Sequence, residues 1–202
     1  MKNIVKHLCL VGLLGMLCGC KNSSAEVLTW KPAGKVLIVC YSESGNQNTL
    51  AVAKWIQELT GGTLHQIKMK TPYSKGYRDV LQESKHHIDN KITPEILPFT
   101  GNVKDYDIIF IGSPVWYGTF APPVGSFIKQ HDLSGKTVMP FCTHGGGGAG
   151  KLYEDLKTAI PGAKIQPGLT VKGSNIVERT IGRGTKSKAS KDEVIRHLNN
   201  IK

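Results

Sequence analysis

Residues 35–62 read KVLIVCYSESGNQNTLAVAKWIQELTGG and decide the fold of this chain. The first seven, Lys35 to Tyr41, form an almost unbroken apolar and β-branched run, which is typical of a strand buried on both faces of a parallel sheet. A short polar loop comes next. Apolar residues at helical spacing then continue to Gly61 and Gly62, which predicts a helix that ends there. A buried strand, a loop and a helix in this order are the first unit of an α/β domain.

The rest of the chain repeats this alternation. Further strands are expected at residues 63–69, 107–112, 137–143 and 165–172. Further helices are expected at residues 77–90, 124–130, 149–160 and 191–201. Strands that alternate with helices indicate one parallel sheet with helices packed on both of its faces. The predicted fold class is therefore α/β, with a doubly wound, five-stranded parallel sheet.

The first twenty residues, MKNIVKHLCLVGLLGMLCGC, have the pattern of a secretory signal peptide. Lys2 and Lys6 precede an almost wholly apolar stretch, His7–Gly19, which is shorter than the ~20 residues that a membrane-spanning helix needs. The end of the segment, Leu17–Cys20, resembles the lipobox of bacterial lipoproteins, in which the last cysteine is acylated. The resemblance implies lipidation at Cys20 and an exported, membrane-anchored lipoprotein of the bacterial cell envelope. An ordinary cleaved signal or an N-terminal anchor is the alternative.

Three segments are expected after this reading of the N-terminus. Residues 1–20 are the signal peptide, residues 21–34 are a polar tether, and residues 35–202 are one domain. Trp30 in the tether either packs on the edge of the domain or is exposed. Only Cys40 and Cys142 lie in the domain, both in apolar runs, so we expect two buried thiols and no disulfide framework.

The chain is strongly basic. Lys and Arg outnumber Asp and Glu by 26 to 15, which gives a formal net charge of +11, and loss of Lys2 and Lys6 with the signal lowers it to +9. An excess of this size suits an anionic membrane surface, an acidic redox partner or nucleic acid. Because the chain carries an export signal and no readout motif, we expect no nucleic-acid partner.

Ligands of α/β sheets bind in the loops at the carboxyl ends of the strands, and three such loops stand out. Ser42–Asn48 (SESGNQN) places hydroxyls, a glycine and amides at a helix N-terminus, where backbone N–H groups and the helix dipole favour a phosphate. Ser113–Pro123 (SPVWYGTFAPP) holds Trp116 and Tyr117, which are expected to be exposed as a platform for a flat ring. Thr143–Lys151 (THGGGGAGK) holds four consecutive glycines, which let a ligand approach the backbone closely.

The third loop also matches two nucleotide-binding patterns incompletely. Gly145–Lys151 fits G-x-x-x-x-G-K, but the following residue is Leu152 where a P-loop has a hydroxyl for Mg²⁺. Its glycines also fit G-x-G-x-x-G, but the acidic residue expected about 20 positions later is absent. Neither pattern is therefore assigned a function.

Taken together and in order, the three loops resemble those of the flavodoxin family. The resemblance implies strand order 2-1-3-4-5 and a non-covalently bound FMN. The cofactor-binding residues that it implies are Ser42, Ser44, Gly45, Asn46, Gln47 and Asn48 for the phosphate, Pro114, Val115, Trp116, Tyr117 and Gly118 beside the isoalloxazine, and Thr143, His144, Gly145 and Gly147 on its other side. Gln47 departs from the usual threonine, although its amide can still donate to a phosphate.

The resemblance implies electron transfer through FMN, with a redox partner protein or a small-molecule electron donor or acceptor. One alternative is an FMN-dependent NAD(P)H oxidoreductase of the quinone-reductase type, which needs a second pocket beside the ring. The insert Thr71–Pro98, with Tyr73 and Tyr77, is the candidate for that pocket. A non-redox lipoprotein that has lost the flavin is the other alternative. No metal site is expected, because His144 has no ligand constellation near it in sequence.

Overall fold

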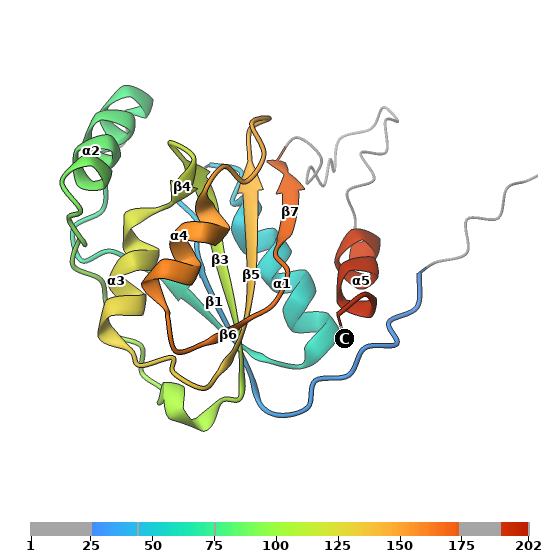
Figure 1. Cartoon of the computed structure of the whole chain (residues 1–202). Helices are drawn as coiled ribbons and strands as arrows, with labels where there is room; N and C mark the ends of the chain where they lie inside the picture. The colour runs from blue at the N-terminus through green and yellow to red at the C-terminus, as the bar shows by residue number, and fades with distance from the viewer. Residues whose placement is uncertain (1–25, 44, 75, 174–190, 202) are drawn as a thin grey trace, which may run out of the picture.

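The computed structural model describes residues 26–43, 45–74, 76–173 and 191–201. Its centre is a parallel sheet (Figure 1). The strands lie in the order β2 (Thr63–Ile67), β1 (Val36–Tyr41), β3 (Ile108–Trp116), β5 (Thr137–His144), and then β6 (Lys164–Ile165) and β7 (Leu169–Lys172), which both pair with β5. The predicted α/β fold and its 2-1-3-4-5 order are confirmed, with β6 and β7 together in the fifth position.

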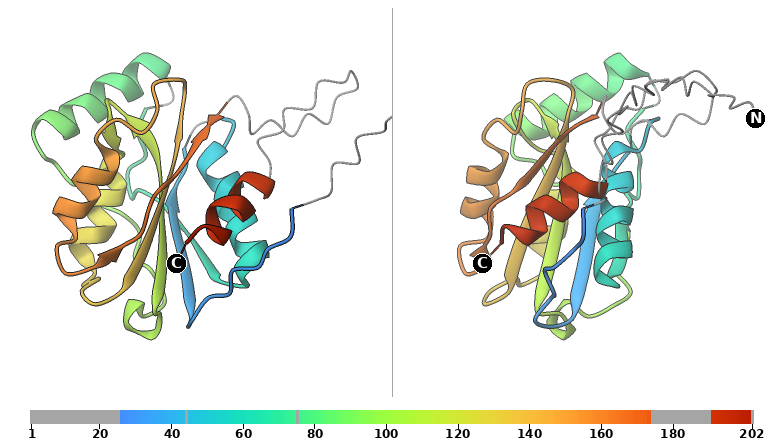
Figure 2. Two further views of the ribbon diagram at one scale, coloured as in Figure 1. Left: turned by 45° about the vertical axis from the view of Figure 1, so that its right-hand side comes forward. Right: turned by 90° about the vertical axis from the view of Figure 1, so that its right-hand side faces the viewer.

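Helices cover both faces of the sheet, as Figure 2 shows. One face carries α1 (Asn48–Thr60) and α5 (Lys191–Asn199), and the other carries α3 (Pro122–Gln130) and α4 (Leu152–Ala159). A further helix, α2 (Tyr77–Asp89), projects beyond the β2 side of the sheet, and the short η1 (Val103–Asp105) precedes β3. None of the helices in the described ranges is long and apolar enough to cross a bilayer.

Strand β1 shows why this sequence forms a two-sided sheet. All six of its residues are buried. Leu37, Val39 and Tyr41 belong to the core under α3 and α4, whereas the alternate positions belong to the core under α1 and α5. Burial of one Leu or Ile side chain contributes about 1.5–3 kcal/mol, so a run that is apolar on both faces holds the two helix layers together.

The structure differs from the sequence expectation at the end of β3. We expected a loop from Ser113, but the strand continues to Trp116 and turns into the antiparallel strand β4 (Thr119–Phe120). The two residues between them, Tyr117 and Gly118, both have positive φ, 49° and 81°. A two-residue hairpin turn of type I′ requires this backbone conformation at both positions. A rigid hairpin therefore stands where a loop was expected.

The last strand and one helix also differ from the sequence expectation: the strand is divided, and the helix begins later. The expected strand 165–172 is divided into β6 and β7, and Pro167, which has no N–H to donate to a sheet, lies in the gap. Helix α4 starts at Leu152 rather than at residue 149, because the glycine-rich turn extends to Gly150, whose φ is +58°. Neither change alters the order of the elements.

The described part of the expected tether, residues 26–34, packs against α5 (Figure 2). The Asn199 Oδ1 atom accepts hydrogen bonds from the Thr29 N–H (2.8 Å), the Thr29 hydroxyl (2.9 Å) and the Trp30 N–H (3.0 Å). Its Nδ2 donates to the Val27 carbonyl (2.9 Å). Trp30 packs edge-on against Phe110, with 6.3 Å between ring centroids. Of the two possibilities for Trp30, packing on the domain is the one observed.

Candidate functional site

The first loop leads into an uncapped helix N-terminus. Gln47 precedes α1 in the left-handed conformation (φ 48°), no side chain caps the helix, and its first turn holds no acidic residue. The first N–H groups of a helix have no acceptors within the helix, and the positive end of its dipole lies there. The end of α1 is therefore suited to an anion.

Ser42 supplies a buried hydroxyl beside this helix end. The residue is 2% exposed, and its Oγ has no hydrogen-bond partner among the described residues. A buried polar atom without a partner is uncommon in a folded protein, because it costs about 1–3 kcal/mol. Within the described part of the chain, the hydroxyl is thus available to bond to a ligand oxygen.

Two neighbouring residues hold this loop in place. The side chain of Gln66 on β2 donates to the Ser42 carbonyl (2.9 Å) and to Gln47 Oε1 (3.2 Å). In the first turn of α1, the Thr49 hydroxyl bonds to the Thr143 hydroxyl at the end of β5 (2.8 Å), and both residues are buried. The second bond joins the first loop to the start of the third.

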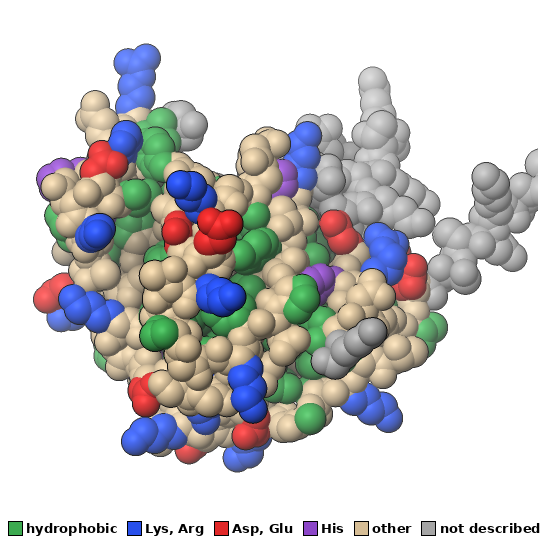
Figure 3. Space-filling view, in the orientation of Figure 1, with side chains coloured by type: hydrophobic (Ala, Val, Ile, Leu, Met, Phe, Trp, Pro, Cys, Tyr) green, Lys and Arg blue, Asp and Glu red, His purple; other side chains and the backbone are tan. Residues whose placement is uncertain are grey.

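The hairpin turn and the glycine-rich loop enclose a pocket of about 430 Å³. Val115 and Gly118 line one side, and His144 to Gly148 with Gly150 line the other. A Cβ atom added at any glycine from 145 to 148 would meet nothing within 4 Å, so this wall faces open space. Figure 3 shows the hollow at the upper edge of the molecule, beside the tip of this loop. Its volume is within the range of small-ligand sites.

One contact fixes the distance between the two walls. The Lys151 N–H donates to the Gly118 carbonyl at 2.6 Å. Gly150 beside it has φ +58°, and a Cβ atom there would collide with the Gly118 carbonyl oxygen. Only glycine therefore allows the loop to approach the hairpin this closely. Within the loop, the Gly148 N–H donates to His144 Nδ1 (3.0 Å) and folds the chain back on itself.

The aromatic pair does not form the open platform that we expected. Trp116 is half-buried, with its ring edge-on to Tyr41 (5.7 Å between centroids) and to Tyr73 (5.6 Å). Tyr117 is 49% exposed and leans on α2, where its hydroxyl donates to the Leu81 carbonyl (2.9 Å). The expectation of an exposed Trp116 is thus corrected: the indole has two aromatic partners, and Val115 lines the pocket instead.

The remaining predicted site residues lie at the same edge of the sheet. Gly45 and Asn46 are exposed in the first loop, Asn48 opens α1, and Pro114 on β3 is paired with Thr143 on β5. Ser44 and the predicted lipidation site Cys20 lie outside the described residues. The described residues contain no group of three or more His, Cys, Asp or Glu that could hold a metal ion.

Sequence analysis missed four residues that shape this edge: Gln66, Thr49, Gly150 and Gly173. Gly173 follows β7, and a Cβ atom there would press on the Asn48 side chain at the start of α1. Its signal was its position after the fifth strand, at the edge where the other strands also end. Gln66 and Thr49 act through partners distant in sequence, so no local pattern marks them.

Comparisons with known proteins agree with this geometry. A family model described as flavodoxin matches residues 35–182. A crystal structure of a candidate flavoprotein from Bacteroides eggerthii is 29% identical, with a TM-score of 0.62, over 71% of this chain and 93% of the other. A flavoprotein from Lactobacillus acidophilus, crystallised in complex with FMN, is 27% identical, with a TM-score of 0.61, over 71% of this chain and 97% of the other. No match was found among curated protein sequences.

Proposed function

This chain belongs to the flavodoxin family, and we propose on that premise that it is a redox protein that transfers electrons through a non-covalently bound FMN. The observation that carries the proposal is the buried Ser42 hydroxyl beside the uncapped end of α1, which has no partner in the described part of the chain. A phosphate needs such donors, and the nearby pocket leaves room for a ring system. FMN, once bound, supplies the electron-carrying chemistry, and the protein positions and tunes it.

Each wall of the site has a separate role in this proposal. Ser42 and the loop from Gly45 to Asn48 hold the phosphate, together with Ser44. Hairpin residues Pro114 to Gly118 flank one side of the ring, and Thr143 to Gly147 flank the other with backbone donors. The bond between the Thr49 and Thr143 hydroxyls keeps the phosphate end and the ring end in register.

A titration of the flavin-free protein with FMN tests the proposal. FMN fluorescence should be quenched on binding, and the complex should be yellow. Ser42→Ala removes a hydroxyl that has no partner among the described residues, so it should not lower the flavin-free stability, while it should weaken FMN binding about tenfold. Ser134→Ala, at an exposed serine before β5 whose side chain bonds to Asp132, is the control and should leave FMN binding unchanged. A protein that ignores FMN would instead match the non-redox alternative.

A second candidate, an FMN-dependent NAD(P)H oxidoreductase, is favoured by one observation. The insert 71–98 forms a pocket of its own around Tyr73. The side chain of Tyr77, at the start of α2, is outside the described part of the structure. Anaerobic mixing of the FMN-loaded protein with NADPH separates the two candidates, because an electron-transfer protein without a nicotinamide site is reduced only slowly by it.

We also propose that the protein is an exported lipoprotein anchored through Cys20. The support is the sequence Leu17–Cys20 behind an apolar signal stretch. Growth of a bacterial expression host with labelled palmitate should label the wild-type protein in the membrane fraction. Cys20→Ala should abolish the label and release the protein from the membrane, whereas Cys18→Ala should keep both. Label on the Cys20→Ala protein would contradict the assignment.

A further inference from the structure

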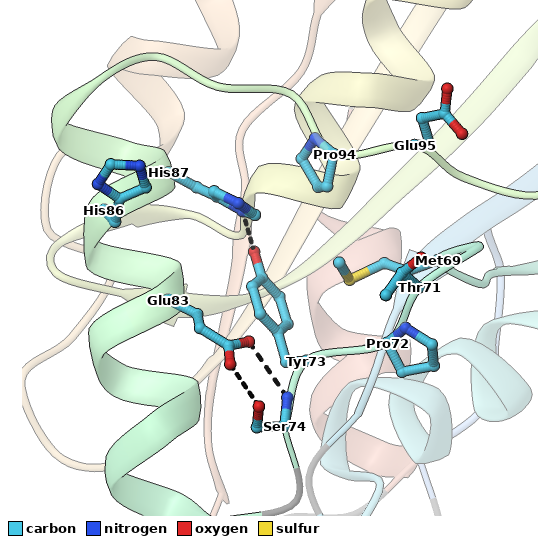
Figure 4. Close-up of a pocket in the computed structure, with 10 residues that line it drawn as sticks. All are labelled: Met69, Thr71, Pro72, Tyr73, Ser74, Glu83, His86, His87, Pro94 and Glu95. Atoms are coloured by element: carbon cyan, nitrogen blue, oxygen red, sulfur yellow. Dashed lines mark hydrogen bonds between the residues drawn. The ribbon is translucent and has the colours of Figure 1, made fainter.

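A second pocket lies on the far side of the hairpin from the candidate FMN site. It has a volume of about 560 Å³ and lies between α2 and the chain segments 69–74 and 94–95 (Figure 4). Tyr73 stands in its centre, with Glu83 and His87 reaching toward it from α2. Electron transfer through FMN does not itself require this pocket, which is the one that favours the oxidoreductase candidate above.

One aromatic wall separates the two pockets. Tyr73 lines the second pocket, is only 6% exposed, and packs edge-on against Trp116 with 5.6 Å between ring centroids. Trp116 directly follows Val115, which lines the first pocket. Tyr117, at the turn of the hairpin, is bonded to Leu81 on α2, so the helix that forms the second pocket is attached to the hairpin. A ligand in this pocket would therefore lie just behind the flavin-flanking hairpin.

The charged groups of the second pocket disfavour an anionic ligand. Two carboxylates, Glu83 and Glu95, line it, and no Lys or Arg is among its described lining residues. Both carboxylates already have partners: Glu83 accepts from the Ser74 N–H and hydroxyl, and Glu95 pairs with Lys70 (3.0 Å). A dinucleotide pyrophosphate would meet two carboxylates, of which only Glu95 has a cationic partner. Because both carboxylates already have partners within the protein, they do not require a cationic ligand. An uncharged molecule therefore fits best.

The uncharged lining combines flat apolar surfaces with hydrogen-bond donors. Met69, Pro72 and Pro94 supply apolar walls. Burial raises the pKa of the Tyr73 hydroxyl and lowers the pKa of His87, so both are neutral at pH 7. The Tyr73 hydroxyl lies 2.9 Å from His87 Nδ1. When the hydroxyl donates this bond, the neutral imidazole carries its proton on Nε2 and keeps an N–H to offer.

We propose that this second pocket binds an uncharged quinone-class molecule, that is, a flat ring with carbonyl oxygens, as the small-molecule redox partner of the protein. The walls of Met69, Pro72 and Pro94 suit the ring, and the donors on His87 and Thr71 suit the carbonyl oxygens. The redox role of the bound quinone rests on the proposed function, whereas binding itself needs no flavin.

Equilibrium dialysis of the flavin-free protein tests the binding directly. The probe is 2,3-dimethyl-1,4-naphthoquinone, which has no open ring position for a thiol to attack. 2,3-Dimethylnaphthalene, which lacks the two carbonyl oxygens, and NADH, which carries the pyrophosphate, are compared with it. The quinone should bind about tenfold more tightly than either compound, a difference that two carbonyl hydrogen bonds readily supply.

Two matched variants locate the bound quinone. Thr71→Trp fills the pocket from an exposed position and should weaken quinone binding about tenfold or more. Thr158→Trp makes the same change on the exposed side of α4, away from the pocket, and should have no effect. A circular dichroism spectrum and a thermal melt verify that both variants fold.

Three results would overturn the inference. They are equal binding of the hydrocarbon, tighter binding of NADH, and quinone binding that Thr71→Trp leaves unchanged. The FMN titration on the same preparation is independent of this outcome. A protein that binds the quinone but not FMN would refute the proposed function and leave the second pocket assigned.

Discussion

Replacement of Gly150, which is not itself a predicted cofactor-binding residue, by alanine should open the candidate FMN site. Gly150 has φ +58°, and the Cβ atom of an alanine there would run into the backbone of Gly118. Because the obstacle is backbone and not the end of a flexible side chain, the glycine-rich loop or the hairpin must move. The bond from the Lys151 N–H to the Gly118 carbonyl (2.6 Å) breaks when they separate.

The size of the effect follows from two contributions. A non-glycine residue in the left-handed conformation costs about 1–2 kcal/mol. Loss of one backbone hydrogen bond costs about 0.5–1.5 kcal/mol. Gly148→Ala is the matched control, because Gly148 has φ +74° in the same loop but open space around its Cβ position. The two variants share the first cost, so only Gly150→Ala should show the additional loss, about twofold to twelvefold in FMN affinity.

FMN titration by fluorescence quenching measures the difference, and thermal unfolding of the flavin-free proteins shows how much of the cost falls on stability. Gly135→Ala, at a position with φ +75° and open space outside the candidate site, should lose stability but bind FMN like the wild type. If Gly148→Ala and Gly150→Ala weaken FMN binding equally, the contact between loop and hairpin does not shape the site and the reasoning fails.

Two further predictions concern stability. Burial lowers the pKa of four histidines below the ordinary 6.5, namely His65, His87, His131 and His197. Below pH 6.5 the unfolded chain therefore binds protons that the folded chain does not bind. The free energy of unfolding is highest above that pH and falls below it, by up to about 1.4 kcal/mol per pH unit for each histidine. Urea unfolding at pH 7.5, 6.5 and 5.5 measures this pH dependence. The double variant His65→Gln and His131→Gln should show a smaller loss of stability at low pH. A wild-type stability that does not change with pH would refute the prediction. Asn199→Ala should release the segment 26–34 from α5, lower the free energy of unfolding by about 1–2 kcal/mol and make the segment accessible to protease. Asn200→Ala should do neither. Equal digestion of the two variants would show that the Asn199 bonds do not hold the segment.

The sequence predicts most of this fold because a two-sided parallel sheet leaves a strong local signal. Each central strand is buried on both faces over most of its length, so its residues there are mainly apolar, and each helix carries a single apolar face. The break at Pro167 and the late start of α4 at Leu152 come from backbone chemistry at individual residues. Such details shift a boundary but leave the order of elements unchanged.

The candidate site is less visible in the sequence, because its walls depend on contacts between distant residues. The residues that meet at the strand ends are predictable from the topology. The orientation of Trp116 is not, since it depends on Tyr41 and Tyr73 in other elements. The approach of Gly150 to Gly118 likewise requires knowledge of how two loops pack. Local pattern thus places the backbone of the site, and long-range packing decides which side chains face it.

The hydrogen bonds between Asn199 and residues 27–30 limit the distance between the domain and Cys20. Since the segment from Glu26 onward is fastened to α5, only residues 21–25 lie between the fastened part and Cys20. Fully extended, that length spans at most about 20 Å. A lipid on Cys20 would therefore hold the domain close to the bilayer. Any partner that exchanges electrons with the domain would then have to bind at the membrane surface.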